Sequence, residues 1–347
     1  MYFFQLTLLY SLLTVSAVDA PVKPIATPEA PRATNIIYQS KDGGQTWEDV
    51  SYSLPESVQP EGFFSGASEI YVRTNGLMYR SKSNLKTPVW EKVNVIDQKS
   101  TITFNKSGVL AYSYDGKIYQ KKNSTDSDNS RWLSGQDWLP AYPNLKSNSV
   151  ATIFEAADGS LFLGTGKSLS KSTDNAQSWK VVQKVWVGDI VESNGVLLAT
   201  GQKGIMRSTD GGDNWEWVIS EGGVGIAIEQ IQDGFAAIAY NTETKSRRIH
   251  ISKDNGKTWQ TLEGLPPSAT ISSIKQVGRY LLCGHPDGIF RSSDLGKSWT
   301  RVHSSVDQYQ FQFLKIGNTD PLNDQRKVFK IHVSGSVVYA VAVNSGC

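Results

Sequence analysis

An eight-residue pattern, Ser-x-Asp-x-Gly-x-x-Trp, occurs five times in this chain of 347 residues, once with Ala in place of Gly, and limits the fold more than any other feature. We call these five copies octets. The last four begin 36, 44 and 40 residues apart. Two degenerate copies, Ser81 to Trp90 and Asn123 to Trp132, fit the gaps. This period predicts one supersecondary unit that is stacked several times. The five octets span residues 40–47, 172–179, 208–215, 252–259 and 292–299.

Each fixed position of the octet has a physical role. We expect the Asp carboxylate to accept hydrogen bonds from backbone N–H groups of a turn, and the glycine to supply a positive φ. The Trp begins the next strand and packs between neighbouring hairpins. Ala176, which replaces the glycine of the second octet, predicts a modified turn or modest strain there. A structural role is therefore predicted for Asp42, Trp47, Asp174, Trp179, Asp210, Trp215, Asp254, Trp259, Asp294 and Trp299.

Short apolar runs beside the octets are typical of strands. Residues 205–207 and 289–291 lead directly into octets, and a glycine turn separates such runs from a further strand, as in residues 195–200. The octet then joins the third strand of each repeat to the fourth. Repeats of four strands and this length predict the blades of a β-propeller.

The two ends of the chain complement each other. Residues 35–39 enter directly as a third strand, whereas residues 328–333 and 337–343 look like a first and a second strand with no octet after them. One blade shared between the termini would close the ring and hide its edges. The sequence therefore predicts an all-β fold, a single propeller of seven blades, with six or eight as alternatives because the middle of the chain is irregular.

The octets resemble the Asp box, or BNR repeat, of the sialidase superfamily, and the resemblance covers nearly the whole mature chain. It implies that the octets lie on the outer rim of a propeller and that their aspartates are structural, not catalytic. Such boxes occur in sialidases, xyloglucanases, sortilin-like receptors and photosystem II assembly factors, so they specify a fold better than a function. The resemblance to the assembly factors rests on size and boxes alone.

The catalytic pattern of sialidases is absent from this sequence. That family holds the substrate carboxylate with three arginines, the first in a Phe-Arg-Ile-Pro-like motif, and the nearest arginine here, Arg32, is in a linker-like segment. Arg80, Arg207 and Arg291 precede octets, at equivalent strand positions. Xyloglucanases resemble two propellers around a cleft, and this chain is long enough for one. We predict no catalytic residues, and interpret Glu69, Asp189 and Glu192 as surface or inner-strand acids; the alternative is a sialidase-like glycoside hydrolase.

Composition excludes several other classes of function. The chain is 39% hydrophobic and 20% charged, as is usual for a globular protein. A net charge of +2 without a dense basic block gives no electrostatic footprint for nucleic acid. Cys283 and Cys347 form neither a disulfide framework nor a Cys-rich metal site, and the four histidines lack metal-ligand spacing. We therefore predict no metal and no cofactor.

The N-terminal segment predicts export. Residues 1–20 resemble a secretory signal peptide with an apolar run too short to span a membrane, residues 21–33 form a Pro-rich linker, and residues 34–347 form the propeller domain. We predict a secreted protein, extracellular or periplasmic, with no membrane span in the mature chain. Asn105 and Asn123 lie in sequons for glycosylation.

Aromatic residues outside the repeat are the candidate binding residues. The loops that join blades, and those between second and third strands, gather at one end of a propeller. Trp138 and Tyr142 lie in an apparent insert, residues 134–143, and Trp186 and Tyr309 occupy other loops. Aromatic side chains beside polar groups stack on sugars or anchor a partner protein. The sequence therefore predicts a non-catalytic binding or assembly protein with a protein or carbohydrate ligand.

Overall fold

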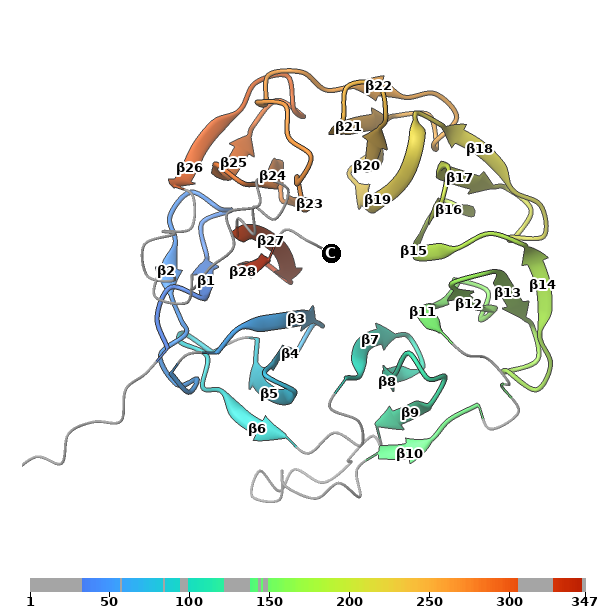
Figure 1. Ribbon diagram of the computed structural model, residues 1–347, viewed down its shortest axis with the longest axis horizontal. Helices are drawn as coiled ribbons and strands as arrows, with labels where there is room; N and C mark the ends of the chain where they lie inside the picture. The colour runs from blue at the N-terminus through green and yellow to red at the C-terminus, as the bar shows by residue number, and fades with distance from the viewer. Residues whose placement is uncertain are drawn as a thin grey trace, which may run out of the picture. The chain divides into compact units, whose positions relative to one another are not determined.

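A computed structural model shows an all-β protein of seven four-stranded antiparallel sheets arranged as blades around an axis (Figure 1). The seven-bladed prediction is confirmed. No helix in the part of the chain that the structure describes is long and apolar enough to cross a membrane. The structure describes residues 33–56, 58–83, 85–93, 99–121, 138–142, 145, 149–304 and 327–344, so the predicted signal peptide and nearly all of the linker lie outside the described residues.

The first two strands of each blade form its inner half. The innermost strands are β3 (Pro60–Ser65), β7 (Thr101–Asn105), β11 (Val150–Glu155), β15 (Val187–Ser193), β19 (Gly222–Ile231), β23 (Ser273–Val277) and β27 (Lys327–Ser334). The second strands are β4 (Glu69–Thr74), β8 (Gly108–Tyr112), β12 (Leu161–Thr165), β16 (Val196–Gly201), β20 (Gly234–Asn241), β24 (Tyr280–His285) and β28 (Val337–Asn344).

The third and fourth strands complete each blade toward the rim. The third strands are β5 (Leu77–Lys82), β9 (Ile118–Lys121), β13 (Leu169–Ser172), β17 (Gly204–Ser208), β21 (Ser246–Ser252), β25 (Gly288–Ser292) and β1 (Ile37–Ser40). The fourth strands are β6 (Glu91–Val93), β10 (Trp138–Pro140), β14 (Lys180–Gln183), β18 (Glu216–Ile219), β22 (Gln260–Thr261), β26 (Thr300–Ser304) and β2 (Glu48–Asp49). We number the blades 1 to 7 from β3–β6 to the blade of β27, β28, β1 and β2.

Blade 7 closes the ring with strands from both ends of the chain. Strand β1 pairs with β28 from Ile37 opposite Val341 to Ser40 opposite Val338, as the two incomplete ends predicted. The buried Tyr339 hydroxyl accepts a hydrogen bond from Gln39 Nε2 (3.0 Å) and donates one to the Ser83 carbonyl of blade 1 (3.0 Å). Closure therefore joins three segments of the chain and covers the face of blade 1 that packs against blade 7.

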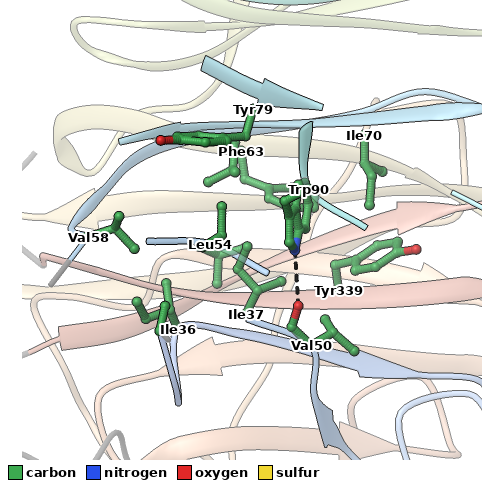
Figure 2. Close-up of a cluster of buried hydrophobic side chains, with 13 residues drawn as sticks. Ile36, Ile37, Val50, Leu54, Val58, Phe63, Ile70, Tyr79, Trp90 and Tyr339 are labelled. Atoms are coloured by element: carbon green, nitrogen blue, oxygen red, sulfur yellow. Dashed lines mark hydrogen bonds between the residues drawn. The ribbon is translucent and has the colours of Figure 1, made fainter. Parts of the chain in front are cut away.

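The core is divided into layers between neighbouring blades. The largest layer joins blades 7 and 1, where Phe63, Ile37 and Tyr339 surround the indole of Trp90 (Figure 2). Trp90 Nε1 donates a hydrogen bond of 3.0 Å to the Val50 carbonyl, so its polar atom is satisfied inside the layer. The ring is thus held by hydrophobic contacts between consecutive blades, since each sheet alone would expose both faces.

The five octets fold into one common turn. In the third octet, Asp210 Oδ1 accepts hydrogen bonds from the Ser208 hydroxyl (2.8 Å) and the Asn214 N–H (3.0 Å), and Oδ2 accepts one from the Asn214 side chain (2.7 Å). These bonds lower the Asp210 pKa to about 2. Ala176 adopts the same turn at φ 64°, in the left-handed region that favours glycine, so this octet carries backbone strain.

One Trp per blade begins or immediately precedes the fourth strand. Each packs in the layer shared with the preceding blade, as Trp215 does against Phe162. In blade 2 this position is held by Trp138, which pairs with Lys121 at the register of an octet serine. The sequence predicts Trp138 in an insert outside the repeat, and the structure corrects this. Trp138 lies in β10, is 8% exposed and packs against Tyr71 and Met78. Trp132 lies outside the described residues.

Candidate binding groove at the ring axis

A groove of about 750 Å³ lies beside the ring axis at the ends of the innermost strands of blades 3, 4 and 5. In a four-stranded meander, the turn after the first strand and the turn after the third lie at the same end, so the groove opens on the octet end. The predicted binding loops occupy the opposite end. The groove is lined by Lys106, Phe154, Glu155, Ala157, Val191, Glu192, Ser193, Asn194, Gly195, Glu229 and Gln230.

Two glutamates of the groove are fixed by hydrogen bonds between blades. Glu155 at the end of β11 accepts a hydrogen bond through Oε2 from the Ser107 N–H of blade 2 (2.8 Å). Glu192 in β15 accepts a hydrogen bond through Oε2 from the Ala157 N–H of blade 3 (2.5 Å). Among the described residues, the Oε1 atom of each accepts no hydrogen bond. Each carboxylate is therefore held in place by one oxygen and has the other for a ligand.

The same strand position caps the preceding blade elsewhere in the ring. Gln276 accepts the Gln232 N–H through its side-chain oxygen, Gln230 Nε2 donates to Ser193 Oγ (3.1 Å), and Ser65 Oγ donates to the Val333 carbonyl (3.2 Å). Each of these residues, and each of the two glutamates, lies opposite a residue of the second strand of its blade. That residue in turn lies opposite the serine at the octet serine position of the third strand. Only blades 3 and 4 place carboxylates there.

An ion cluster adjoins the groove through Glu229, which belongs to both. Lys275 Nζ of β23 contacts Glu229 Oε2 of β19, with 30% and 18% of the side chains exposed. Burial raises the Glu229 pKa against the opposing effect of Lys275. Burial also raises the pKa of Asp189 in β15, against opposing effects of Lys275 and Lys330. For Lys275, the carboxylates of Glu229 and Asp189 outweigh burial and raise its pKa. Lys275 therefore stays charged and balances one of these two acids.

Blade 7 contributes basic groups to the same axis. Lys330 of β27 is exposed, and His332 lies two residues further along this strand, its ring 4.9 Å from that of Phe63. Burial, with the charges of Lys330 and Lys275, holds the His332 pKa well below its usual range. His332 is therefore neutral at physiological pH.

Apolar side chains complete the groove. Phe154 packs against the layer between blades 3 and 4, and Val191 against the layer between blades 4 and 5, and both are half-buried and reach the groove. The rim residues Lys106, Ala157 and Asn194 are exposed. The groove therefore combines rigid carboxylates with a partly apolar wall, the composition of a binding site that orients its ligand by a few polar groups.

The four predicted binding aromatics do not come together at this groove. Tyr142 packs edge-on against Trp179, with ring centroids 6.4 Å apart, and Trp138 is in the layer between blades 1 and 2. Trp186 is half-buried, and a Cβ added to Gly188 would lie 2.6 Å from its indole. Tyr309 lies outside the described residues. A role in binding for any of the four stays a prediction.

The three acids interpreted from the sequence have different environments. Glu69 contacts Lys121 Nζ (2.7 Å) and Arg80 (3.4 Å) between blades 1 and 2, and it does not line the groove. Asp189 faces the axial ion cluster and Glu192 lines the groove. The sequence reasoning missed Glu155, Glu229 and Lys275.

A repeated signal marks these cap positions in the sequence. Glu155, Glu192, Gln230 and Gln276 precede the octet serine of their blade by 17, 16, 22 and 16 residues, and each comes shortly before a glycine turn. The signal identifies the capping position. It does not identify the groove, which depends on how the blades are arranged around the axis.

Four arginines in the described part of the chain are engaged by residues that do not line the groove. Arg207 Nε donates to the Asn255 carbonyl of the next octet (2.8 Å), and Arg291 Nε to the Gly43 carbonyl (2.9 Å). Arg247 donates to the Ile271 carbonyl (2.8 Å), and Arg248 contacts Glu221 (3.2 Å). These arginines thus link neighbouring segments by hydrogen bonds or an ion pair. Within the described ranges, no group of three or more His, Cys, Asp or Glu is arranged to hold a metal ion.

Comparison with known proteins identifies the fold and leaves the family open. No protein-family model and no curated protein sequence matches the chain. Among solved structures, YCF48 from Cyanidioschyzon merolae is similar at 14% identity and a TM-score of 0.56, over 84% of this chain and 95% of that one. YCF48 bound to D1 peptide is similar at 14% identity and a TM-score of 0.50, over 85% and 95%.

A glycoside hydrolase has the same fold. The GH74 xyloglucanase from Xanthomonas campestris is similar at 14% identity and a TM-score of 0.57, over 75% of this chain and 50% of the enzyme. The matched region therefore covers about half the length of that enzyme. At these identities the similarities show a common propeller fold and nothing about activity.

Proposed function

We propose that this chain is a secreted, non-catalytic propeller that binds a protein or carbohydrate partner at the axial groove. The observation that carries the proposal is the fixed pair of carboxylates. Glu155 and Glu192 are each held by a backbone N–H of the preceding blade, so they are preorganised before a ligand arrives. Preorganisation lowers the entropic cost of binding.

Two further observations support a binding role over a structural one. The volume of about 750 Å³ is in the usual range for ligand sites. A YCF48 structure that is similar to this chain over 95% of its own length has been solved bound to D1 peptide. By analogy, we favour a protein partner.

Filling the groove tests the proposal. Ala157 is exposed and lines the groove, and Ala157→Trp would fill it while keeping the backbone N–H that Glu192 accepts. The wild type and this variant should be screened on a peptide array and a glycan array. We expect the wild type to bind ligands that Ala157→Trp no longer binds. The control is Gln202→Trp, in an exposed turn at the other end of blade 4, and it should still bind them. Equal binding by both variants would place the ligand elsewhere.

A glycoside hydrolase is the second candidate, and the axial acids favour it specifically. Asp189 and Glu229 have raised pKa values, as proton-donating carboxyl groups do in such enzymes. Against this, Lys275 holds Glu229 in an ion pair, and the arginines named above are engaged elsewhere. We expect no hydrolysis of a fluorogenic sialoside or a β-glucan. Turnover that Glu229→Gln abolishes would favour the enzyme.

A further inference from the structure

We propose that the groove takes a lysine or arginine side chain from an extended peptide segment, with its cation attracted by the carboxylates of Glu155 and Glu192 that line the groove. This inference rests on the proposed function, because it names the ligand of the same site. Three features of the groove support it: its charge, its apolar wall and the position of its carboxylates.

The charge of the groove is negative after its internal ion pair is counted. Of the lining residues, Glu155, Glu192 and Glu229 are acidic and Lys106 is basic. Glu229 is paired with Lys275 of β23, which lies outside the groove lining. Glu155 and Glu192 are held only by neutral backbone N–H groups, which leave their charge unbalanced. A cationic group would balance this charge, whereas an anionic one would be repelled.

The two carboxylates line the same groove from equivalent positions of consecutive blades. Glu192 reaches out of blade 4 to Ala157, only two residues after Glu155 in blade 3. Both side chains line one groove and present an oxygen with no partner among the described residues. Guanidinium and ammonium groups carry several N–H donors and bind such oxygens by charge-assisted hydrogen bonds.

The apolar wall suits the stem of a long basic side chain. Phe154 and Val191 flank the two glutamates in sequence and line the same groove. Lysine and arginine place three or four methylene groups between backbone and charge, and these pack on apolar surface. A small inorganic cation would leave this wall uncovered, so the wall favours a side chain as the ligand.

Attraction by the whole protein does not account for such binding. The chain carries a formal net charge of +2, so long-range forces do not concentrate cations at its surface. Recognition of a basic side chain would depend on local contacts in the groove. Binding should therefore respond to single carboxylates and not to total charge.

Paired variants separate the charge of the groove from its shape. Glu155→Gln with Glu192→Gln removes both charges and keeps a side-chain oxygen for each capping N–H. Glu243→Gln with Glu263→Gln removes two exposed acids elsewhere and is the control of equal net charge. The probes are the capped peptide Gly-Gly-Arg-Gly-Gly and the same peptide with norleucine in place of arginine, titrated into the folded mature protein and followed by NMR.

The expected result is saturable binding of the arginine peptide that the norleucine peptide matches only at about tenfold higher concentration. The Glu155→Gln, Glu192→Gln variant should lose this preference, Ala157→Trp should lose binding, and the control should behave as the wild type. Equal binding of the two peptides, or a preference that survives loss of both charges, would overturn the basic ligand while leaving the groove as the site. No peptide binding at the groove, with glycans as its only ligands, would overturn this inference alone. Binding unaffected by Ala157→Trp would overturn both proposals.

Discussion

The backbone N–H of Ala157 in blade 3 donates a hydrogen bond of 2.5 Å to Glu192 Oε2 in blade 4. The two residues are 35 positions apart, close to one repeat, so the bond links equivalent parts of consecutive blades. The same link recurs between blades 2 and 3 through Glu155 and Ser107. A structural device of the repeat thus also fixes the geometry of the candidate site.

The cap predicts different effects for two substitutions of Glu192. Glu192→Ala leaves the Ala157 N–H to water and should lower the free energy of unfolding by about 0.5–1.5 kcal/mol, the usual net contribution of a hydrogen bond. Glu192→Gln keeps an acceptor and should change it little. Urea denaturation measures both. Equal loss in the two variants would show that the charge, and not the cap, stabilises this turn.

Strain at Ala176 predicts a stabilising substitution. Ala176 has φ 64°, where a side chain costs about 1–2 kcal/mol, and the lower backbone entropy cost of alanine offsets part of this. Ala176→Gly should therefore stabilise the fold by about 0.5–1 kcal/mol. Gly212→Ala is the reverse test in another octet, where the new Cβ would lie 2.5 Å from the Phe162 ring, and it should destabilise. Thermal unfolding of both variants checks the sign.

The octet aspartates predict a dependence of stability on pH. Hydrogen bonds lower the Asp210 pKa to about 2, below the value of about 3.9 in an unfolded chain. The ionised form is therefore favoured by folding, so its stabilising effect is present above about pH 4 and is lost as pH falls through about 2. Asp210→Asn should lower the melting temperature at pH 7, and the difference from wild type should shrink toward pH 2. A difference independent of pH would refute the ionic origin.

Local signals explain what the sequence could predict. The octets contain their own turn hydrogen bonds, as those of Asp210 to Ser208 and Asn214 show, so strands and blades follow from short-range pattern. In blade 2 the octet serine position holds Lys121, and the local signal fails. The sequence therefore predicts an insert at Trp138, although this residue holds the repeated Trp position. The pairing of β10 with β9 assigns it that position.

The candidate groove had no comparable local signal. Glu155 meets Ser107 across 48 residues, and Lys275 meets Glu229 across 46. Such contacts depend on the angle between blades, which no short segment specifies. The sequence predicts surface or inner-strand positions for Asp189 and Glu192, and the ring arrangement places both beside the axis. Acids or amides at one position before each octet would have directed attention to this end of the ring.

The Lys275 ion pair supports a final prediction about stability and its pH dependence. Removing this cation by Lys275→Met leaves Glu229 and Asp189 close together without their counter-charge. A fully buried broken pair costs roughly 3–5 kcal/mol, and we expect about 1–3 kcal/mol here because 30% of the Lys275 side chain is exposed.

The pH dependence distinguishes this electrostatic effect from lost packing. Burial already raises the pKa of both acids, so their ionised forms oppose folding, and the opposition grows as pH rises above the unfolded value of about 4. Without Lys275 the opposition is stronger at neutral pH and is relieved by protonation in acid. The destabilisation by Lys275→Met should therefore be largest near pH 7 and shrink toward about pH 4. Adding Glu229→Gln should restore part of the stability at pH 7. A loss that is constant with pH and unchanged by Glu229→Gln would assign the role of Lys275 to packing of its stem.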